Sequence, residues 1–555
     1  MNQSCRDGEA ENPPERRGAG RRGAVAVGLL LFLIAACAPS TGGSNPAPSG
    51  RFAFDPAGAL FASSYRQIRD YYLDPVSVES LALAGIGTLD AGSAGAGIDL
   101  ADHAVRLLDH GTEIARLPRP DPLDAEGWAE VTSAALSAAR THDPALAAAT
   151  DEELYRRVFE GVTGKLDRFS RYAGAEAARD QKASRDGFGG IGVTLDYTET
   201  EPRITSVTPD GPAARAGVRI DDRIVIIDGV PTVGLDERQV TAKLRGRPES
   251  RVFLALDRRS RPRRDGLIPM TLTRSLIVPV SVTAERDDGI AIFRVANFNH
   301  DTAKSLAQQF ERMRAEMGPS MTGIVLDLRS NPGGLLDQAV DVAGMFLDRG
   351  EIVAAAGRHP TSNQDFEAGG KDQTNGLPMV VLVDGGSASS AEIVAAALQD
   401  DGRAVVVGSS SYGKGTVQMV ITLENTGELT LTWARLVTPS GYILHHHGVV
   451  PAFCTSEPID PVAPAEDGSA RLARILEQGL HPVPGIATKP RSSLTEAGWE
   501  DLRKSCPSET RDSALDLVVA ERLLQDRTLY AQALTLPGIA VAHDPDSRPV
   551  HSALQ

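Results

Sequence analysis

Ser389 has the setting of a serine that can act as a nucleophile. It lies in residues 384–392, which read DGGSASSAE and lead from an apolar run into a helical pattern. With Glu392 three residues on, Ser389 fits the N-cap of a capping box. That role is compatible with chemistry, because the macrodipole and the free N–H groups at a helix N-terminus favour developing negative charge. A serine placed there is suited to attack on a carbonyl carbon.

Lys414 is the candidate general base for this serine. Residues 413–418 read GKGTVQ, and they fail the Walker spacing G-x-x-x-x-G-K-[ST] of a phosphate loop. The Lys414 amine must be neutral to accept a proton, so burial has to lower its pKa from about 10.4. Gln418 can hold this amine if the segment is helical or turned, which is the form useful to the mechanism. In a strand the two residues would lie about 13 Å apart.

Histidine is the rival base. A Ser-His-Asp triad needs a histidine, but none occurs between His359 and His445, and neither lies in a recognisable motif. His445 begins a run of three histidines, which could indicate a metal ion. Neighbouring side chains of a strand point to opposite faces, so at most two of the three converge. We therefore expect an exposed loop there, no metal site, and lysine as the base.

Adjacent glycines in a third motif could supply an oxyanion hole. Residues 327–334 read DLRSNPGG and lie between a strand pattern and a helical one. At Gly333 and Gly334 the missing side chains let backbone N–H groups approach a ligand. A plain strand-to-helix turn would use the same pair, so the glycines alone leave both interpretations open.

Apolar strands that alternate with helices must position these motifs. The alternating segments are residues 323–328, 336–346, 379–383, 391–398 and 404–407. This alternation predicts a layered α/β core. Because α/β folds bind ligands at the carboxyl ends of their strands, we expect the three motifs to meet there.

A small β-rich domain is expected over residues 187–275. Short strands with Gly and Asp-Gly turns flank the run GPAARAGV at residues 211–218, and this order closely resembles the PDZ domains of bacterial proteases. A PDZ groove adds a peptide's C-terminus as a strand while backbone N–H groups bind its carboxylate. The expected groove residues are a carboxylate loop of Phe188, Gly189, Gly190 and Ile191, and a floor of Val240 and Leu244 on one helix face.

Taken together, the motifs resemble the carboxyl-terminal processing peptidases over roughly residues 187–451. The resemblance implies a layered peptidase core of the crotonase or ClpP type. It assigns Ser389 as nucleophile, Lys414 as base, Gln418 as the family's glutamine, and the N–H groups of Ser390 and of Gly333 or Gly334 as oxyanion donors.

The sequence departs from the family pattern in two places. The family's Ser-Ala-Ser-Ala-Ser-Glu reads Ser-Ala-Ser-Ser-Ala-Glu here, so Ser387 and Ser390 remain alternative serines. The expected aspartate after Pro451 is Ala452. Any role of that aspartate is therefore absent.

At 555 residues, the chain is too long for one hydrophobic core, and we expect a multidomain α+β protein. Its parts are a signal peptide (1–36), a flexible tether (37–50), an N-terminal helical region (51–186), a PDZ domain (187–275), a serine peptidase core (276–460) and a C-terminal helical extension (461–555).

The N-terminus has the pattern of a lipoprotein signal peptide. Arginines precede an apolar run, residues 24–36, that is too short to span a bilayer. The run ends in Ile-Ala-Ala-Cys, which resembles a lipobox, so Cys37 would be the lipid-bearing mature N-terminus. An ordinary cleavage site with an incidental cysteine is the alternative. Of the 4 cysteines, Cys5 would leave with the signal, and Cys454 and Cys506 could pair in an oxidising periplasm.

These features together predict a serine endopeptidase that binds the apolar C-terminal tail of a protein and cleaves it through an acyl-enzyme. No cofactor is expected, and the net charge of −16 argues against a nucleic-acid partner. The expected location is the periplasm, lipid-anchored, with the outer membrane favoured because Ala38 follows the cysteine. One alternative is a non-catalytic PDZ-bearing scaffold or adaptor, and another is a crotonase-like acyl-CoA enzyme. Homo-oligomerisation and an adaptor partner stay open.

Overall fold

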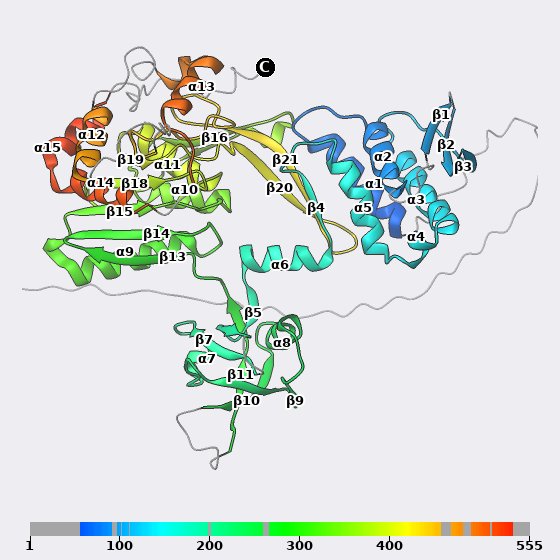
Figure 1. Ribbon diagram of the computed structural model, residues 1–555, viewed down its shortest axis with the longest axis horizontal. Coiled ribbons are helices and arrows are strands. Elements are labelled where there is room, and N and C mark those ends of the chain that lie inside the picture. The colour runs from blue at the N-terminus through cyan, green and yellow to red at the C-terminus, as the bar shows by residue number, and fades with distance from the viewer. Residues whose placement is uncertain are drawn as a thin grey trace, which may run out of the picture. The chain divides into compact units, whose positions relative to one another are not determined.

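The computed structural model describes residues 56–90, 97–101, 103–109, 111–197, 201–258, 266–456, 468–480, 490–510 and 513–536 (Figure 1). The predicted signal peptide, the lipidation site Cys37 and the tether lie outside these residues. Within the described ranges, no helix is long and apolar enough to cross a membrane.

Amphipathic helices build most of the N-terminal region, as their three- and four-residue spacing predicts. Helix α1 buries Leu60, Phe61, Tyr65 and Ile68 along one face. The helices are α1 (Pro56–Tyr71), α2 (Val78–Gly87), α3 (Ala125–His142), α4 (Pro144–Ala148), α5 (Asp151–Thr163) and α6 (Ala175–Asp186).

The same region also contains strands, which its helical pattern did not predict. An antiparallel sheet is formed by β1 (Gly97–Ala101), β2 (Ala104–Asp109) and β3 (Thr112–Pro118). Val105 and Leu107 alternate along β2 and are buried against the helices. The short strand β4 (Arg171–Ala173) pairs with a strand of the peptidase core.

The PDZ domain is a sheet with the strand order β11-β10-β8-β7-β6, so β6 is an edge strand. Its elements are β6 (Val193–Asp196), β7 (Arg203–Val207), α7 (Pro212–Arg215), β8 (Arg223–Ile227), β9 (Val230–Pro231), α8 (Glu237–Leu244), β10 (Arg251–Asp257) and β11 (Ile268–Thr273). The chain enters and leaves the domain through an antiparallel ribbon of β5 (Phe188–Gly190) and β12 (Ser275–Ile277).

The peptidase core is a sheet with the order β13-β14-β15-β18-β19-β22, parallel from β14 onward. Its strands are β13 (Val282–Asp287), β14 (Ile290–Val295), β15 (Gly323–Asp327), β18 (Met379–Val383), β19 (Val405–Gly408) and β22 (Phe453–Cys454). Helices α9 (Thr302–Met317), α10 (Leu336–Gly344) and α11 (Ser390–Asp400) cover one face.

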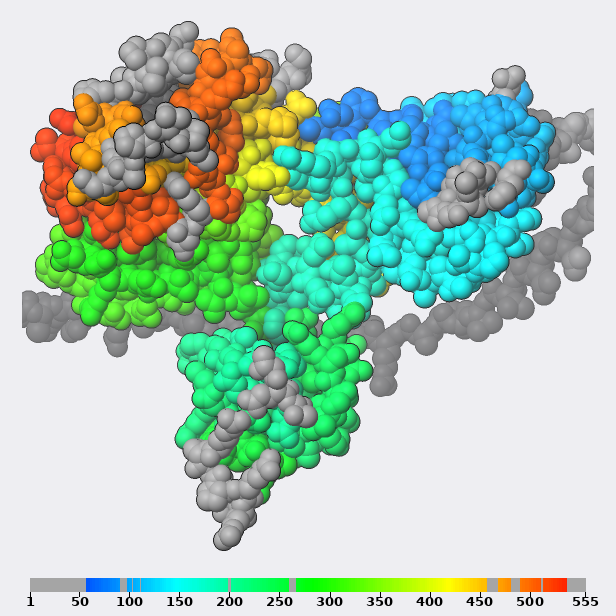
Figure 2. Space-filling view, viewed as in Figure 1, coloured from blue at the N-terminus to red at the C-terminus, as the bar shows by residue number. Residues whose placement is uncertain are grey.

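The C-terminal extension covers the other face of this sheet. Its helices are α12 (Gly468–Leu480), α13 (Glu496–Ser505), α14 (Ala514–Gln525) and α15 (Arg527–Leu534). Along β18, Val381 packs with α9–α11, whereas Val380 and Leu382 pack with the C-terminal helices. Helices α12, α14 and α15, orange to red in Figure 2, therefore form a layer of an α/β/α sandwich, whereas α13 packs in a separate cluster with Tyr442 and Val450.

A long hairpin joins the core to the N-terminal region. It consists of β20 (Thr416–Thr422) and β21 (Glu428–Val437), in a second sheet with β16 (Glu351–Ala356) and β17 (Gln364–Glu367). Leu429 and Leu431 of β21 are buried in the same cluster as the N-terminal helices. The segment around β4 thereby comes to lie against the hairpin that follows Lys414.

Candidate active site

The three motifs meet at the carboxyl ends of neighbouring parallel strands, as the sequence predicted. Residues 327–334 follow β15, residues 384–392 follow β18, and residues 409–415 follow β19. Hydrogen bonds lock the first two motifs together. Ala388 N donates to Asn331 O at 2.9 Å, and Ser330 N donates to Asp384 Oδ1 at 2.7 Å.

Ser389 stands on a strained turn between β18 and α11. As the N-cap of α11 it has φ 54° and ψ −115°, a backbone conformation that non-glycine residues rarely adopt. Such strain costs on the order of 1–3 kcal/mol and concentrates at active sites. A strand-to-helix turn of this kind exposes a nucleophilic serine at the top of a sheet in unrelated hydrolases.

The neighbouring serines have structural roles. The Ser387 hydroxyl donates to Leu328 O at 2.8 Å and accepts from Asp384 N at 2.9 Å. The Ser390 hydroxyl donates to Gly334 O at 3.0 Å. Both side chains are buried, whereas Ser389 is half-exposed. Ser389 is therefore the serine of this run that a substrate can reach.

The glycine pair lies directly against Ser389. A Cβ added to Gly333 would be 2.8 Å from the Ser389 Cβ, so no larger residue fits there. The Gly333 N–H already donates to Asn331 Oδ1 at 2.8 Å. Among the described residues, no protein acceptor is found for the N–H groups of Gly334 and Ser390. Of the two glycines, Gly334 is thus the better oxyanion donor.

The environment of Lys414 favours the neutral amine. Burial lowers the pKa of Lys414 from its usual 10.5, and the nearby cation of Arg171 acts in the same direction, whereas Glu392 and Asp167 oppose them. The Lys414 Nζ lies 5.2 Å from the centre of the Phe169 ring. Phe169 precedes β4, so the N-terminal region contributes to this site, and no sequence signal had pointed to it.

Glu392 connects the nucleophile motif to the base motif. Its Oε2 accepts from Ser389 N at 2.8 Å and from Lys414 N at 2.9 Å. Its Oε1 accepts from Gly413 N at 2.7 Å and from the Ser411 hydroxyl. Burial raises the pKa of this carboxyl, and the four hydrogen bonds act in the opposite direction. The capping-box spacing identified its bond to Ser389 but gave no sign of the others.

The expected role of Gln418 is not supported by its contacts. Its segment is strand β20, the alternative in which the sequence predicted no contact between Gln418 and the Lys414 amine. The Gln418 Nε2 donates to Thr416 Oγ1 at 2.8 Å and to Thr432 Oγ1 at 3.3 Å. The Gln418 amide is thus bound to two threonines, and the bulge between Val417 and Gln418 interrupts the alternation of the strand. No hydrogen bond links Ser389 to Lys414 Nζ within the described residues.

The histidine run forms a tight turn beside the site instead of an exposed loop. Only His446 of the three is exposed. His447 stacks on Trp499, with ring centres 4.5 Å apart. Burial lowers the pKa of His445 to about 4, and its ring lies 6.0 Å from that of Phe169. Of the three, His445 is therefore the histidine to substitute in a test for a histidine base.

Three of the predicted carboxylate-loop residues of the PDZ domain, Phe188, Gly189 and Gly190, lie in a strand. Gly189 and Gly190 belong to β5 and pair with Leu276 and Ser275 of β12. Gly189 O also accepts from Gly246 N at 2.9 Å. Because the ribbon uses this backbone, an open loop from Phe188 to Gly190 was a wrong expectation.

The remaining PDZ residues border the edge strand. Ile191 follows β5 and leads to β6, while Val240 and Leu244 of α8 are buried in the same cluster. The Tyr197 hydroxyl, just after β6, lies 3.3 Å from Thr241 Oγ1 of α8. Strand β6 and helix α8 therefore lie side by side, and the outer edge of β6 pairs with no other strand in the described part of the chain.

The layered α/β core, the strained strand-to-helix turn that exposes Ser389 and the smaller β-rich domain together indicate a serine peptidase with a PDZ domain. The family model of peptidase family S41 matches residues 289–453, and a PDZ family model matches residues 203–258. The carboxy-terminal-processing protease of Bartonella bacilliformis is 36% identical over 311 residues, covering 56% of this chain and 71% of that protein. The carboxyl-terminal-processing protease of Synechocystis sp. is 31% identical over 318 residues, covering 56% and 72%.

A solved structure of the photosystem II D1 C-terminal processing protease is 23% identical, with a TM-score of 0.35, and covers 75% of this chain and 97% of that one. The chain belongs to peptidase family S41, among the carboxy-terminal processing proteases. The alternatives of a non-catalytic scaffold and of an acyl-CoA enzyme are not favoured.

Glu392→Gln should lower kcat by at least about tenfold, because the amide has one acceptor oxygen and turns an N–H donor toward other donors. The melting temperature should also fall, since an unsatisfied buried polar group costs about 1–3 kcal/mol. Peptidase kinetics and thermal unfolding measure the two effects. Glu500→Gln is the control, because its exposed carboxylate pairs with Lys504 on the surface. A wild-type kcat for Glu392→Gln would contradict the role of this carboxylate.

Proposed function

We propose that the chain is an endopeptidase in which Ser389 and Lys414 act as a catalytic dyad. One observation carries the proposal: the buried Glu392 carboxylate binds the backbone N–H of both residues through a single oxygen. The two loops are thereby held together at the strand ends. The strained turn at Ser389 and the lowered pKa of Lys414 support the same roles.

In the proposed reaction, Ser389 Oγ attacks the carbonyl carbon of the scissile peptide while Lys414 Nζ accepts the hydroxyl proton. The N–H groups of Ser390 and Gly334 stabilise the negative oxygen of the tetrahedral intermediate. Collapse breaks the C–N bond, and Lys414 returns the proton to the leaving amine, which leaves an ester on Ser389. Water then attacks the ester and gives a proton to Lys414, which passes it to Ser389 Oγ as the ester C–O bond breaks. The carboxylic acid product leaves, and Ser389 and the neutral Lys414 are restored.

Attack requires the Lys414 amine to move from the Phe169 ring to the Ser389 hydroxyl. A lysine side chain has rotatable bonds enough for this, and its backbone stays fixed by Glu392. Burial and the Arg171 cation both disfavour the protonated amine while it waits.

The PDZ domain would select substrates by their C-terminal tails. The tail would add to the free edge of β6 as a further strand, and its last side chain would lie over the apolar face that Val240 and Leu244 support. The carboxylate would bind the backbone at Ile191–Gly192, where the chain turns into β6 with a φ of 75° at Gly192. Cleavage would occur upstream of the bound tail.

The proposal also includes a periplasmic location with a lipid anchor on Cys37. The lipobox-like Ile-Ala-Ala-Cys supports the anchor, and the disulfide between Cys454 and Cys506 supports an oxidising compartment. Palmitate labelling of wild type and Cys37→Ser tests the anchor, and equal labelling of both would refute it.

Ser389→Ala and Lys414→Ala should each abolish cleavage of a protein with an apolar C-terminal tail, and Lys414→Arg should fail as well, because arginine cannot accept the proton.

In the wild type, kcat/KM should rise with pH as Lys414 loses its proton, at a pH below 10.5. Arg171→Met should move this rise to higher pH, because it removes a cation that lowers the pKa. Activity retained by Lys414→Ala but lost by His445→Asn would instead identify a histidine base.

Amidating the substrate's C-terminus, or adding a terminal Asp, should lower kcat/KM more than changes several residues upstream. Amidation removes the charge that the backbone N–H groups bind, and a carboxylate in an apolar pocket costs several kcal/mol. Matched substrates that differ only at the terminus give the comparison. Equal kcat/KM for the free, amidated and Asp-ended tails would exclude tail recognition by the PDZ domain.

A further inference from the structure

A segment of the C-terminal extension contacts all three catalytic motifs. It comprises residues 503–510, together with Ser513, which precedes α14, and Asp516 in the first turn of α14. This segment lies outside residues 289–453, which match the S41 family. It contacts the base loop (residues 409–415), the nucleophile turn (residues 384–389) and the oxyanion motif (residues 327–334).

Arg503 binds the backbone of two segments, the base loop and the histidine turn. Its guanidinium donates to Ser411 O at 3.0 Å and to His447 O. Ser411 is the residue whose hydroxyl binds the Glu392 carboxylate. A Cβ on Gly448 would lie 2.9 Å from Arg503 Nη1 and 3.0 Å from Glu392 Oε1, so the cation and the carboxylate converge at that glycine.

At the nucleophile turn, the segment binds the backbone next to Ser389. Gly385 N donates to Glu509 O at 2.8 Å, and the Ser409 hydroxyl donates to the same carbonyl at 2.9 Å. The Ser410 hydroxyl donates to Cys506 O at 2.6 Å. One stretch of extension backbone thus bridges the nucleophile turn and the base loop.

At the oxyanion motif, the extension supplies a buried ion pair. Arg329 makes a bidentate pair with Asp327, and its Nη1 lies 3.2 Å from Asp516 Oδ2. The same Nη1 donates to Ser513 O at 2.7 Å. All three charged side chains are buried, so none can be removed without leaving a buried charge short of partners.

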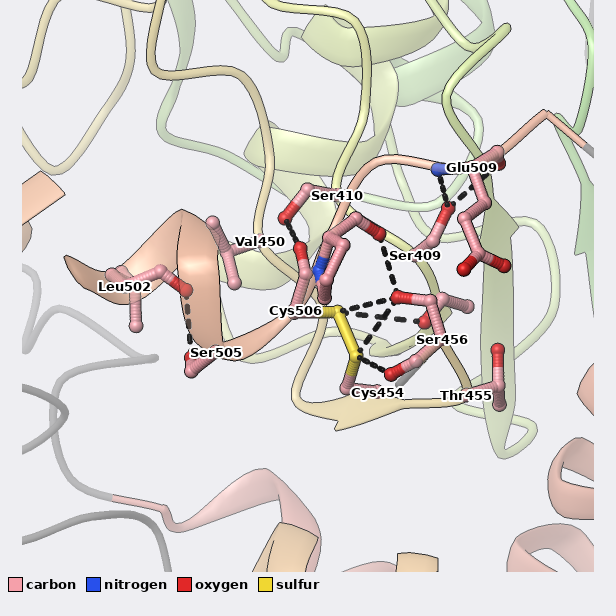
Figure 3. Close-up of a disulfide and its surroundings, with 12 residues drawn as sticks. Ser409, Ser410, Val450, Cys454, Thr455, Ser456, Leu502, Ser505, Cys506 and Glu509 are labelled. Carbon is pink, nitrogen blue, oxygen red and sulfur yellow. Dashed lines mark hydrogen bonds between the residues drawn. A yellow bond between two sulfur atoms is a disulfide. The ribbon is translucent and has the colours of Figure 1, made fainter. Parts of the chain in front are cut away.

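The disulfide fixes this segment to the core sheet. Cys506 is bonded to Cys454 at the end of β22, with the sulfurs 2.06 Å apart. Figure 3 shows the disulfide below the Ser409–Ser410 loop and beside Ser456, whose hydroxyl donates to Pro507 O at 2.6 Å. Along the chain, the covalent link at Cys506 therefore lies between Arg503, which contacts the base loop, and Glu509, which contacts the nucleophile turn.

We propose that this disulfide-anchored segment is a brace that holds the catalytic loops in their working geometry, with Arg503 as a positioning residue for the base loop. The inference rests on the proposed Ser389–Lys414 dyad. Without the brace, the protein would fold and bind tails but would turn over slowly. Reduction of the disulfide would have the same effect, so turnover would depend on an oxidising environment.

Substitution of Arg503 tests the positioning role in the full chain. Arg503→Met should lower kcat at least about tenfold with KM changed less than about twofold, since the PDZ domain is untouched. Arg503→Lys should recover part of the loss, because an ammonium can still donate to a carbonyl. Lys504→Met is the matched control, because Lys504 is exposed and pairs with Glu500 on the surface. A folded Arg503→Met with wild-type kcat, or with only KM raised, would overturn the proposal.

Reduction tests the brace without changing any side chain. Treatment with a reductant should lower the wild-type kcat at least about fivefold, and reoxidation should restore it. Alkylation of Cys454 and Cys506 in a separate, denatured sample verifies that the reduction is complete. The double variant Cys454→Ser, Cys506→Ser should start at the low kcat and not respond. Unchanged turnover after complete reduction would overturn the brace, even if Arg503→Met fails to fold. Ser389→Ala in the same assay separates the two ideas, because residual activity there would refute the dyad instead.

Discussion

The Glu392 carboxylate accepts four hydrogen bonds in a place that water does not reach. Moving a carboxylate out of water costs many kcal/mol unless it is paired and hydrogen-bonded, and here the donors are three backbone N–H groups and one hydroxyl. The donors come from the two loops that carry Ser389 and Lys414. The free energy needed to bury the charge is therefore fully offset only when both loops are in place, so burial of this carboxylate favours the geometry of the dyad.

Two glycines and the strained backbone of Ser389 let the loops come close enough to bind the Glu392 carboxylate together. Gly333 leaves room for the Ser389 Cβ, and the positive φ of Ser389 turns the chain from the loop of residues 384–389 into α11. On the far side, Gly448 leaves room for Arg503 and Glu392 to converge. The sheet beneath is covered on both faces, so the strand ends that carry the loops have little freedom to shift.

Local patterns in the sequence predicted much of this site. Ser389 at a strand-to-helix junction, the three motifs at one sheet edge and the Cys454–Cys506 pair all follow from short-range spacing and composition. For Gln418 the sequence left helix and strand open, because both keep residues four apart on one face, and only the pairing of β20 with β21 decides between them. Gly189 and Gly190 were misplaced because their pairing with β12 joins segments more than eighty residues apart in sequence. Phe169 and Arg503 reach the site through tertiary contacts that no local pattern encodes.

The most direct test of the dyad is the reaction of Ser389 with a fluorophosphonate, which requires neither a tail nor the PDZ domain. Peptide mapping by mass spectrometry should find the adduct on Ser389, and the labelling rate should rise with pH through one ionisation below 10.5, the usual pKa of lysine. In Lys414→Met the rate should be low and should lose that ionisation. An adduct on Ser387 or Ser390, or an unchanged pH dependence in Lys414→Met, would contradict the Ser389–Lys414 dyad.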